Sequence, residues 1–283
     1  MVDFPGIPVT TMIADLRGRF LDTSGNRLTP AQCLDGLNAA QRELAALLPV
    51  SALADITHSE DVSESTATLA QSDLARPFMR LAGLTRASDG VSFNIVYQSE
   101  LDQYRNTLRA PTVDSPIVTP TGRGLVLTPA PTAATTLTVA YLWVPRKMEE
   151  GVAISSYAFA TNSTFVRVSD FGIDDYYNGM HIFNETSLDW FTVGDYTGST
   201  NTFTVTGTNI GWANDEKVTI EPELGAALHP LLVDYAEALL RRTDGNSQIG
   251  QMSMAEYTQY KQQVMARYGF NERELTNIRT GTE

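Results

Sequence analysis

Apolar residues recur at helical spacing early in the chain. In residues 11–20, Met12, Ile13, Leu16 and Phe20 fall on one side of a helix, and Gly25-Asn26 predicts the turn after it. The N-terminal part therefore opens with a helix that buries one face.

A second helix is predicted over residues 29–49. Thr29 is the expected N-cap, Pro30 suits the first helical position, Gln32 completes a capping box and Pro49 ends the helix. One apolar stripe runs along it: Leu34, Leu37, Leu44, Leu47 and Leu48.

Two polar residues, Asn38 and Gln41, interrupt the apolar face of this second helix. They are interpreted either as polar contacts between helices or as solvent-exposed positions. The one cysteine, Cys33, lies in the same helical pattern beside Leu34 and Leu37 and is expected to be a small buried core residue. A chain with one cysteine has no intrachain disulfide.

Residues 50–150 change to a strand-like pattern punctuated by prolines. The strongest candidate is residues 137–144, where Leu137, Val139, Tyr141 and Trp143 alternate with other side chains. Short strands are predicted at residues 93–97, 116–118, 124–127 and 137–144, with a short helix at 99–107.

Residues 151–222 are rich in Thr, Asn, Gly, Asp and aromatic residues. Asn178-Gly179 and Thr197-Gly198 mark turns, and strands at roughly ten-residue intervals indicate a small all-β domain, a sandwich or a barrel, that folds on its own. The five strand candidates are residues 165–168, 180–183, 190–193, 203–205 and 217–220.

The helical pattern returns after residue 222. A helix is predicted from Pro230 to near Gly245, and a capping box at residues 253–256 opens another that ends at Gly269. Residues 271–283 have no period and are expected to form a tail.

The predicted fold class is therefore α+β: a helical bundle with short strands, interrupted by an inserted small all-β domain. Residues 1–150 would form the N-terminal part of the core, 151–222 the inserted β domain, 223–270 the helices that complete the core, and 271–283 the tail. We expect the two outer parts to pack together and the β domain to protrude.

The charge of the chain bears on its partners. The 283 residues carry a net charge of −13, and residues 151–222 hold two basic against nine acidic residues. No segment has the basic excess of a protein that grips phosphates.

The start of the chain lacks a basic segment followed by an apolar one, and no apolar run approaches the roughly 18–20 residues of a membrane span. We expect a protein made in the cytoplasm without membrane contact.

Candidate chemistry is sparse. Asp170-Phe171-Gly172 spells a kinase magnesium motif, but Ser155 stands where the kinase lysine would be, and no catalytic-loop or Gly-rich motif accompanies it. His58, His181 and His229 are scattered singly, and packing or capping explains them. No catalytic residue, cofactor site or metal site is predicted.

Two clusters in the β domain leave alternatives open. Asp170, Asp174 and Asp175 could hold a hard cation, but a solvated acidic turn is favoured because the spacing does not match the helix–loop–helix calcium site. Four aromatic residues could form a platform on which a sugar stacks, but packing in the core of the β domain is the favoured interpretation. The aromatic candidates are Tyr176, Tyr177, Trp190 and Tyr196.

Several segments, in this order, resemble one family. Residues 37–44 (LNAAQREL) are similar to the first helices of tailed-phage head–tail adaptor (connector) proteins, where apolar-Asn-x-Ala-x-x-x-Leu recurs. Residues 229–236 (HPLLVDYA) resemble a C-terminal helix of the same adaptor proteins, which begins with a His-Pro step. Residues 175–182 (DYYNGMHI) and 195–198 (DYTG) look like a β module of phage virion proteins. Residues 50–130 match no such pattern.

The resemblance implies a homo-oligomeric ring, expected to be twelvefold, in the virion neck between the portal protein and the tail or nozzle. DNA would pass through without specific binding. The tail suits partner contacts: Phe270, Leu275 and Ile278 could anchor, and Arg273 and Arg279 could pair with acidic partners. The alternative for these residues is a disordered terminus.

Two other functions remain open. The β insertion could be a glycan- or receptor-binding module that uses Tyr176, Tyr177 and Trp190. An enzyme acting on cell wall or nucleic acid would depend on four carboxylates, Asp170, Asp174, Asp175 and Glu185.

Overall fold

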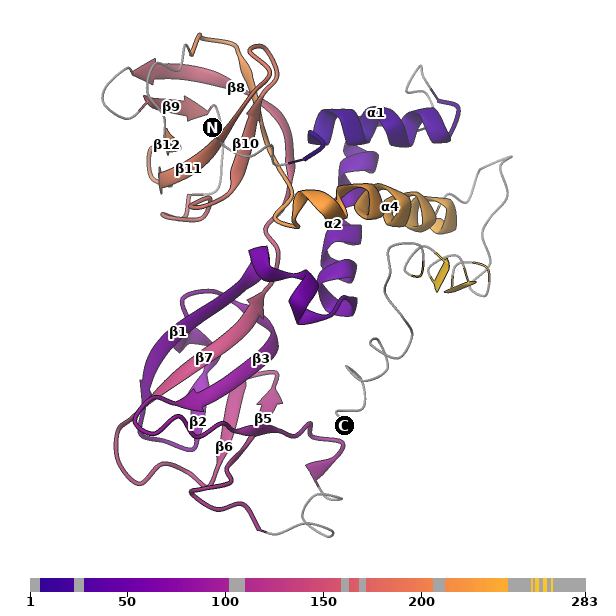
Figure 1. Cartoon of the computed structure of the whole chain (residues 1–283). Helices are drawn as coiled ribbons and strands as arrows, with labels where there is room; N and C mark the ends of the chain where they lie inside the picture. The colour runs from indigo at the N-terminus through magenta and orange to yellow at the C-terminus, as the bar shows by residue number, and fades with distance from the viewer. Residues whose placement is uncertain are drawn as a thin grey trace. The chain divides into compact units, whose positions relative to one another are not determined.

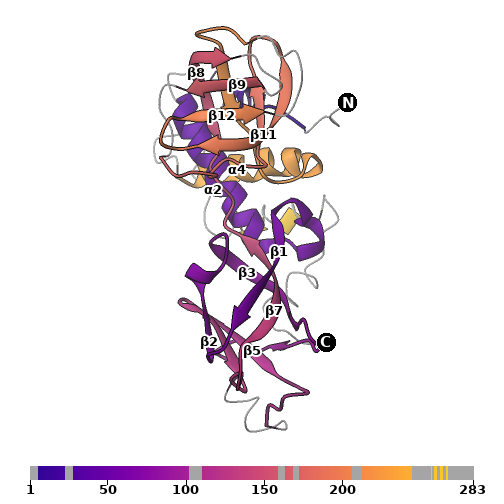
Figure 2. The same ribbon diagram turned by 90° about the vertical axis from the view of Figure 1, so that its left-hand side faces the viewer.

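The computed structural model describes residues 6–22, 28–101, 110–158, 163–167, 172–205 and 212–243, together with positions 256, 258, 259, 262, 263 and 266. The chain divides into two compact units (Figures 1 and 2). The first contains Met1–Leu44 and Pro145–Phe270, and the second contains Ala45–Val144 and Asn271–Glu283. Each unit is described by itself.

The helices of the first unit are α1 (Val9–Arg19), α2 (Pro30–Leu47) and α4 (His229–Thr243), the last turn of α2 belonging to the second unit. They confirm the helices predicted at residues 11–20, at 29–49 and from Pro230. The N-terminal helix α1 packs against the C-terminal helix α4 (Figure 1). The apolar faces of these helices are largely buried, but Leu34 and Leu47 of the predicted α2 stripe are only partly buried. The buried residues are Met12, Ile13, Leu16, Phe20, Leu37, Leu44, Leu48, Leu231, Leu232, Tyr235, Ala236, Leu239 and Leu240.

Local sequence explains where α2 begins. The Thr29 hydroxyl accepts the Gln32 backbone N–H at 3.2 Å, and the Gln32 side-chain oxygen accepts the Thr29 N–H at 2.9 Å, which confirms the predicted capping box. Further along, a Cβ at Gly36 would lie 2.9 Å from Leu240 Cγ. The glycine therefore lets α2 and α4 approach closely. Cys33 is buried as predicted.

Six strands that lie between residues 149 and 220 form a closed antiparallel barrel (Figures 1 and 2). Its strands follow the order β10-β11-β12-β9-β8-β13. All five strands predicted for the β domain are present, and β8 is an additional strand that was not predicted. The bounds are β8 Glu149–Ala158, β9 Ser163–Arg167, β10 His181–Asn184, β11 Asp189–Thr197, β12 Thr202–Val205 and β13 Lys217–Ile220.

Aromatic side chains fill the barrel. Phe165 stacks on Phe203 with ring centroids 4.9 Å apart, and Tyr177 meets Tyr196 edge to face at 4.8 Å. Such pairs stabilise a core beyond the area they bury. The interior is therefore a packed core whose members are contributed by every strand of the barrel.

The second unit contains a three-stranded sheet, order β1-β7-β3, and a four-stranded sheet, order β2-β6-β5-β4. One buried hydrophobic cluster contains residues from both sheets, which shows that the sheets pack against each other. The four predicted strands correspond to β4, β5, β6 and β7; β1, β2 and β3 were not predicted. The bounds are β1 Thr57–Glu64, β2 Thr68–Ala70, β3 Phe78–Arg86, β4 Asn94–Ile95, β5 Ile117–Thr121, β6 Gly124–Thr128 and β7 Thr135–Trp143.

The predicted α+β class with an all-β module is confirmed, and the module is a barrel. The described positions between 256 and 266 are helical, which agrees with the helix predicted there. No helix in the described part of the chain is long and apolar enough to cross a membrane.

Candidate functional site

An ion pair joins the chain segment that enters the barrel, between β7 and β8, to the segment that leaves it, between β13 and α4. Arg146 lies just before β8 and Glu223 lies just after β13. Arg146 donates to Glu223 from Nε at 2.8 Å and from its backbone N–H at 2.6 Å. The side chains are 11% and 4% exposed, so the pair is largely removed from water.

The same arginine also holds a loop of the barrel. Its Nη1 donates to the carbonyl oxygens of Tyr176 and Asn178, in the segment before β10. One guanidinium therefore links the entry to the barrel, the exit from it and a loop between two of its strands.

Asn38 and Gln41, one turn apart on α2, bind the backbone of these connections. Asn38 accepts the Met148 N–H at 2.8 Å and donates to the Met148 carbonyl at 3.1 Å. Gln41 donates to the Arg146 carbonyl at 2.8 Å and accepts the Glu223 N–H at 2.9 Å. Both are buried, which excludes solvent exposure, and these partners are backbone groups of the connections rather than a second helix. We call Asn38, Gln41, Arg146 and Glu223 the junction cluster.

Two buried acceptors fix the start of α1 to the same region. Glu221 accepts the Val9 N–H at 2.9 Å, and His229 Nδ1 accepts the Ile7 N–H at 2.9 Å. His229 Nε2 lies 3.0 Å from the Leu224 carbonyl. Since Nδ1 accepts, Nε2 carries the proton and donates. His229 at the helix start thus has the packing role expected for it.

The pKa of Glu221 is raised to about 7. Burial of the carboxyl is the main cause, and hydrogen bonds from Thr219 and from the Val9 N–H oppose it. The carboxyl is 1% exposed. The chain therefore keeps an acid in its interior that titrates near neutrality and holds a helix terminus.

The carboxylates considered for a metal or an enzyme have structural roles where they are described. Asp174 accepts the Gly198 N–H at 2.8 Å, and Asp175 accepts the Asn178 side-chain amide at 2.7 Å. Burial, together with the nearby carboxylate of Glu150, raises the pKa of Glu185, and Lys217 opposes this shift. Asp170 lies outside the described residues. The described residues hold no group of three or more His, Cys, Asp or Glu that could bind a metal ion.

The aromatic candidates do not form one exposed platform. Tyr177 and Tyr196 are buried in the barrel core, as the favoured interpretation predicted. Tyr176 is half-buried against Tyr177, while Trp190 pairs with Phe183 at 5.2 Å between centroids. The four aromatic side chains therefore serve packing in different places.

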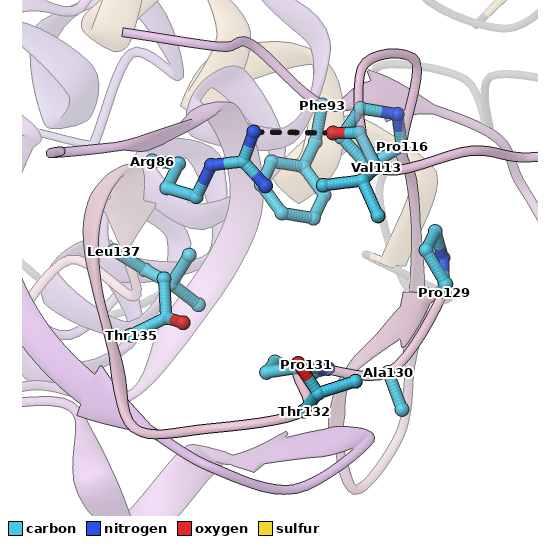
Figure 3. Close-up of a pocket in the computed structure, with 10 residues that line it drawn as sticks. All are labelled: Arg86, Phe93, Val113, Pro116, Pro129, Ala130, Pro131, Thr132, Thr135 and Leu137. Atoms are coloured by element: carbon cyan, nitrogen blue, oxygen red, sulfur yellow. Dashed lines mark hydrogen bonds between the residues drawn. The ribbon is translucent and has the colours of Figure 1, made fainter. Parts of the chain in front are cut away.

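The second unit contains a small, mainly apolar pocket (Figure 3). Its volume is about 100 Å³. The lining comes from the end of β3, the segments before β4 and β5, and the connection from β6 into β7. Arg86 closes one side by donating to the Val113 carbonyl at 3.1 Å. The lining residues are Arg86, Phe93, Val113, Pro116, Pro129, Ala130, Pro131, Thr132, Thr135 and Leu137.

The predicted partner-interface residues of the tail lie outside the described residues: Phe270, Arg273, Leu275, Ile278 and Arg279. Sequence reasoning missed Arg146, Glu221 and Glu223. The available signal was the isolated pair of polar positions on the apolar face of α2, because buried amides require partners.

The scan against protein-family models and the search of curated proteins found no match for this chain.

Proposed function

We propose that this chain is a non-catalytic structural protein of a tailed-phage particle. Copies would form a ring between the portal protein and the tail, and the ring would attach the tail or nozzle proteins. DNA would pass through its centre without specific binding. The protein would be made in the host cytoplasm and would act in the virion neck.

The junction cluster carries this proposal. Both connections of the barrel are tied to α2 by side chain–backbone hydrogen bonds and to each other by a buried ion pair. A buried pair of this kind is strongly destabilising to break, so the barrel is held to its helices at two chain segments rather than on a flexible linker. This suits a part that transmits force between larger assemblies.

The family resemblance supports the same function. Its motif residues Leu37, Asn38, Ala40 and Leu44 are all buried, and Asn38 belongs to the junction cluster. The pattern shared with head–tail adaptors therefore corresponds to packing and clamping positions in this fold.

The charge distribution is consistent with passage of DNA. The chain has a net charge of −13 without a basic excess in any part. A wall without that excess does not gain the counterion-release free energy that retains DNA. A sugar-stacking platform is disfavoured, since Tyr177 and Tyr196, two of its four candidate aromatic residues, are buried in the barrel core.

Binding to the portal tests the proposal. Purified chain would be mixed with portal rings of the same phage and sedimented through a gradient. We expect the chain to move with the portal at a fixed ratio of copies. A chain that stays at the top of the gradient with excess portal would contradict the proposal.

A further inference from the structure

The start of α1 lies on one buried carboxyl. Pro8, at the N-cap position, makes no side-chain hydrogen bond to the helix. Glu221, 212 residues away, accepts the Val9 N–H in its place, and α1 contacts β8 and β13 of the barrel (Figure 1). The first turn of the helix therefore covers the Glu221 carboxyl, and the residue is 1% exposed.

The hydrogen-bond partners of Glu221 suit a neutral acid. The Thr219 hydroxyl has one proton but lies within reach of two acceptors, the Phe183 carbonyl at 3.2 Å and the Glu221 carboxyl. A protonated Glu221 donates to this hydroxyl, which then donates to Phe183, so all three groups are satisfied. An ionised Glu221 instead accepts the hydroxyl proton, and the Phe183 carbonyl loses that bond.

The charges near Glu221 also disfavour its ionisation. Within the described part of the chain no cation pairs with Glu221, and the charge that acts on it is a like charge, Glu185 after β10. Glu150 of β8 acts on Glu185 in turn. His229, at the start of α4, accepts the Ile7 N–H with an unprotonated nitrogen and so holds the neighbouring residues without a charge. Burial and the like charge raise the pKa of Glu221 to about 7.

The other end of α1 is held in a different way. Arg19 pairs with Asp234 at 2.6 Å and with Glu237 at 3.0 Å, both on α4. These pairs do not involve Glu221 or the first turn of the helix. Detachment of residues 6–9 therefore admits water to the Glu221 carboxyl while the ion pairs keep the far end of α1 in place.

We propose that residues 6–9 form a latch, which stays closed on Glu221 while this acid is neutral and opens locally when it ionises. The latch acts within a single copy of the chain, so it does not depend on the adaptor function.

The direction of the pH effect follows from the two states of the latch. An exposed glutamate has a pKa of 4.5, whereas Glu221 under the closed latch has a pKa of about 7. Below pH 4.5 the acid is neutral in both states, and the latch has its full stability. Between these values the open state has lost a proton that the closed state keeps, so the open fraction rises with pH. The rise is up to about 300-fold and levels off above the higher pKa.

Amide hydrogen exchange of the full chain tests the latch. Exchange would be measured at pH 5 and pH 7 on peptides that span the start of α1, and each rate would be divided by the intrinsic rate at that pH. We expect the protection of this segment to fall at least about tenfold from pH 5 to pH 7 relative to Glu221→Gln protein. Barrel strands such as β12 should keep their protection.

Glu221→Gln is the reference because its amide reproduces the neutral acid. The amide donates to the Thr219 hydroxyl and its carbonyl accepts the Val9 N–H, so the latch should stay closed at both pH values. His229 is present in both proteins, so the difference between them isolates Glu221.

Two further variants follow the same exchange. Glu185→Gln removes the like charge and should make the fall in protection smaller. Asp195→Asn, at an exposed position of β11, should leave the fall unchanged.

An equal fall in the native chain and in Glu221→Gln protein would overturn the latch, because another group would then be responsible. Loss of protection in the barrel strands together with α1 would also overturn it, since ionisation would then unfold the unit as a whole. If Glu221→Gln does not fold, identical profiles for the native chain, Glu185→Gln and Asp195→Asn would overturn the latch. A smaller fall confined to Glu185→Gln would support it.

Discussion

The guanidinium of Arg146 and the carboxylate of Glu223 meet across the two connections of the barrel, 77 residues apart in sequence. The pair is buried, so removing one partner leaves an uncompensated charge in the interior. Glu223→Gln is expected to lower the free energy of unfolding by about 3 kcal/mol. Chemical denaturation followed by circular dichroism measures this loss.

The exposed pair Arg86–Asp89 is the control for that variant. Asp89→Asn should change stability far less, because solvent screens an exposed pair. Equal losses for the two variants would show that the Arg146–Glu223 pair has no special role.

Asn38→Ala is expected to destabilise the chain by about 2 kcal/mol. The substitution leaves the buried N–H and carbonyl of Met148 without their side-chain partner. Asn94→Ala, at an exposed position on β4, should have almost no effect. Denaturant midpoints of the two variants would decide between a clamping role and a passive one.

Two helical glycines should respond in opposite ways to alanine. Gly18→Ala should stabilise by up to about 1 kcal/mol, because nothing lies within 4 Å of the added Cβ and alanine favours helix. Gly36→Ala should destabilise by about 1–2 kcal/mol, because the Cβ would press on Leu240 at 2.9 Å. Thermal unfolding of both variants measures the difference, and a gain for Gly36→Ala would contradict the close packing of α2 on α4.

Glu221 should make stability fall as pH rises. Its pKa is raised from 4.5 to about 7, so between these values the folded state holds a proton that the unfolded chain has lost. This difference costs the native state roughly 3 kcal/mol by pH 8 relative to pH 4. The Glu221→Gln variant lacks this titration. Its free energy of unfolding relative to the native chain should therefore rise by roughly 3 kcal/mol between pH 4 and pH 8.

Glu64 supplies the opposite sign. Burial acts to raise its pKa, but hydrogen bonds from Thr66 and Ser65 outweigh it and lower the pKa. Glu64→Gln should therefore lose stability relative to the native chain as pH rises through the acidic range. Unfolding free energies at several pH values test both slopes, and parallel slopes would contradict the assignment.

The sequence predicted the elements with clear periods and missed those without them. The five predicted barrel strands carry inward aromatic or β-branched residues such as Phe165 and Phe203. β1, with the sequence THSEDVSE, has one apolar residue, Val62, and becomes a strand because β7 pairs with it. Pairing with a distant strand determines whether such a segment becomes a strand, and the local sequence pattern does not reveal that pairing.

The junction cluster was predictable only in part. The polar residues Asn38 and Gln41 on an apolar face were evident, but their partners lie 105 to 182 residues away and are largely backbone groups. Backbone groups have no side-chain signature in sequence. The pairing of Arg146 with Glu223 depends equally on barrel closure, which brings the two connections together.

The position of the chain in intact particles tests the central claim most directly. A cryo-electron microscopy reconstruction of the neck should contain this fold in a ring, in contact with the portal on one side and with tail or nozzle proteins on the other. If particles contain the chain only in fibres, or lack it, the account of a head–tail adaptor is wrong.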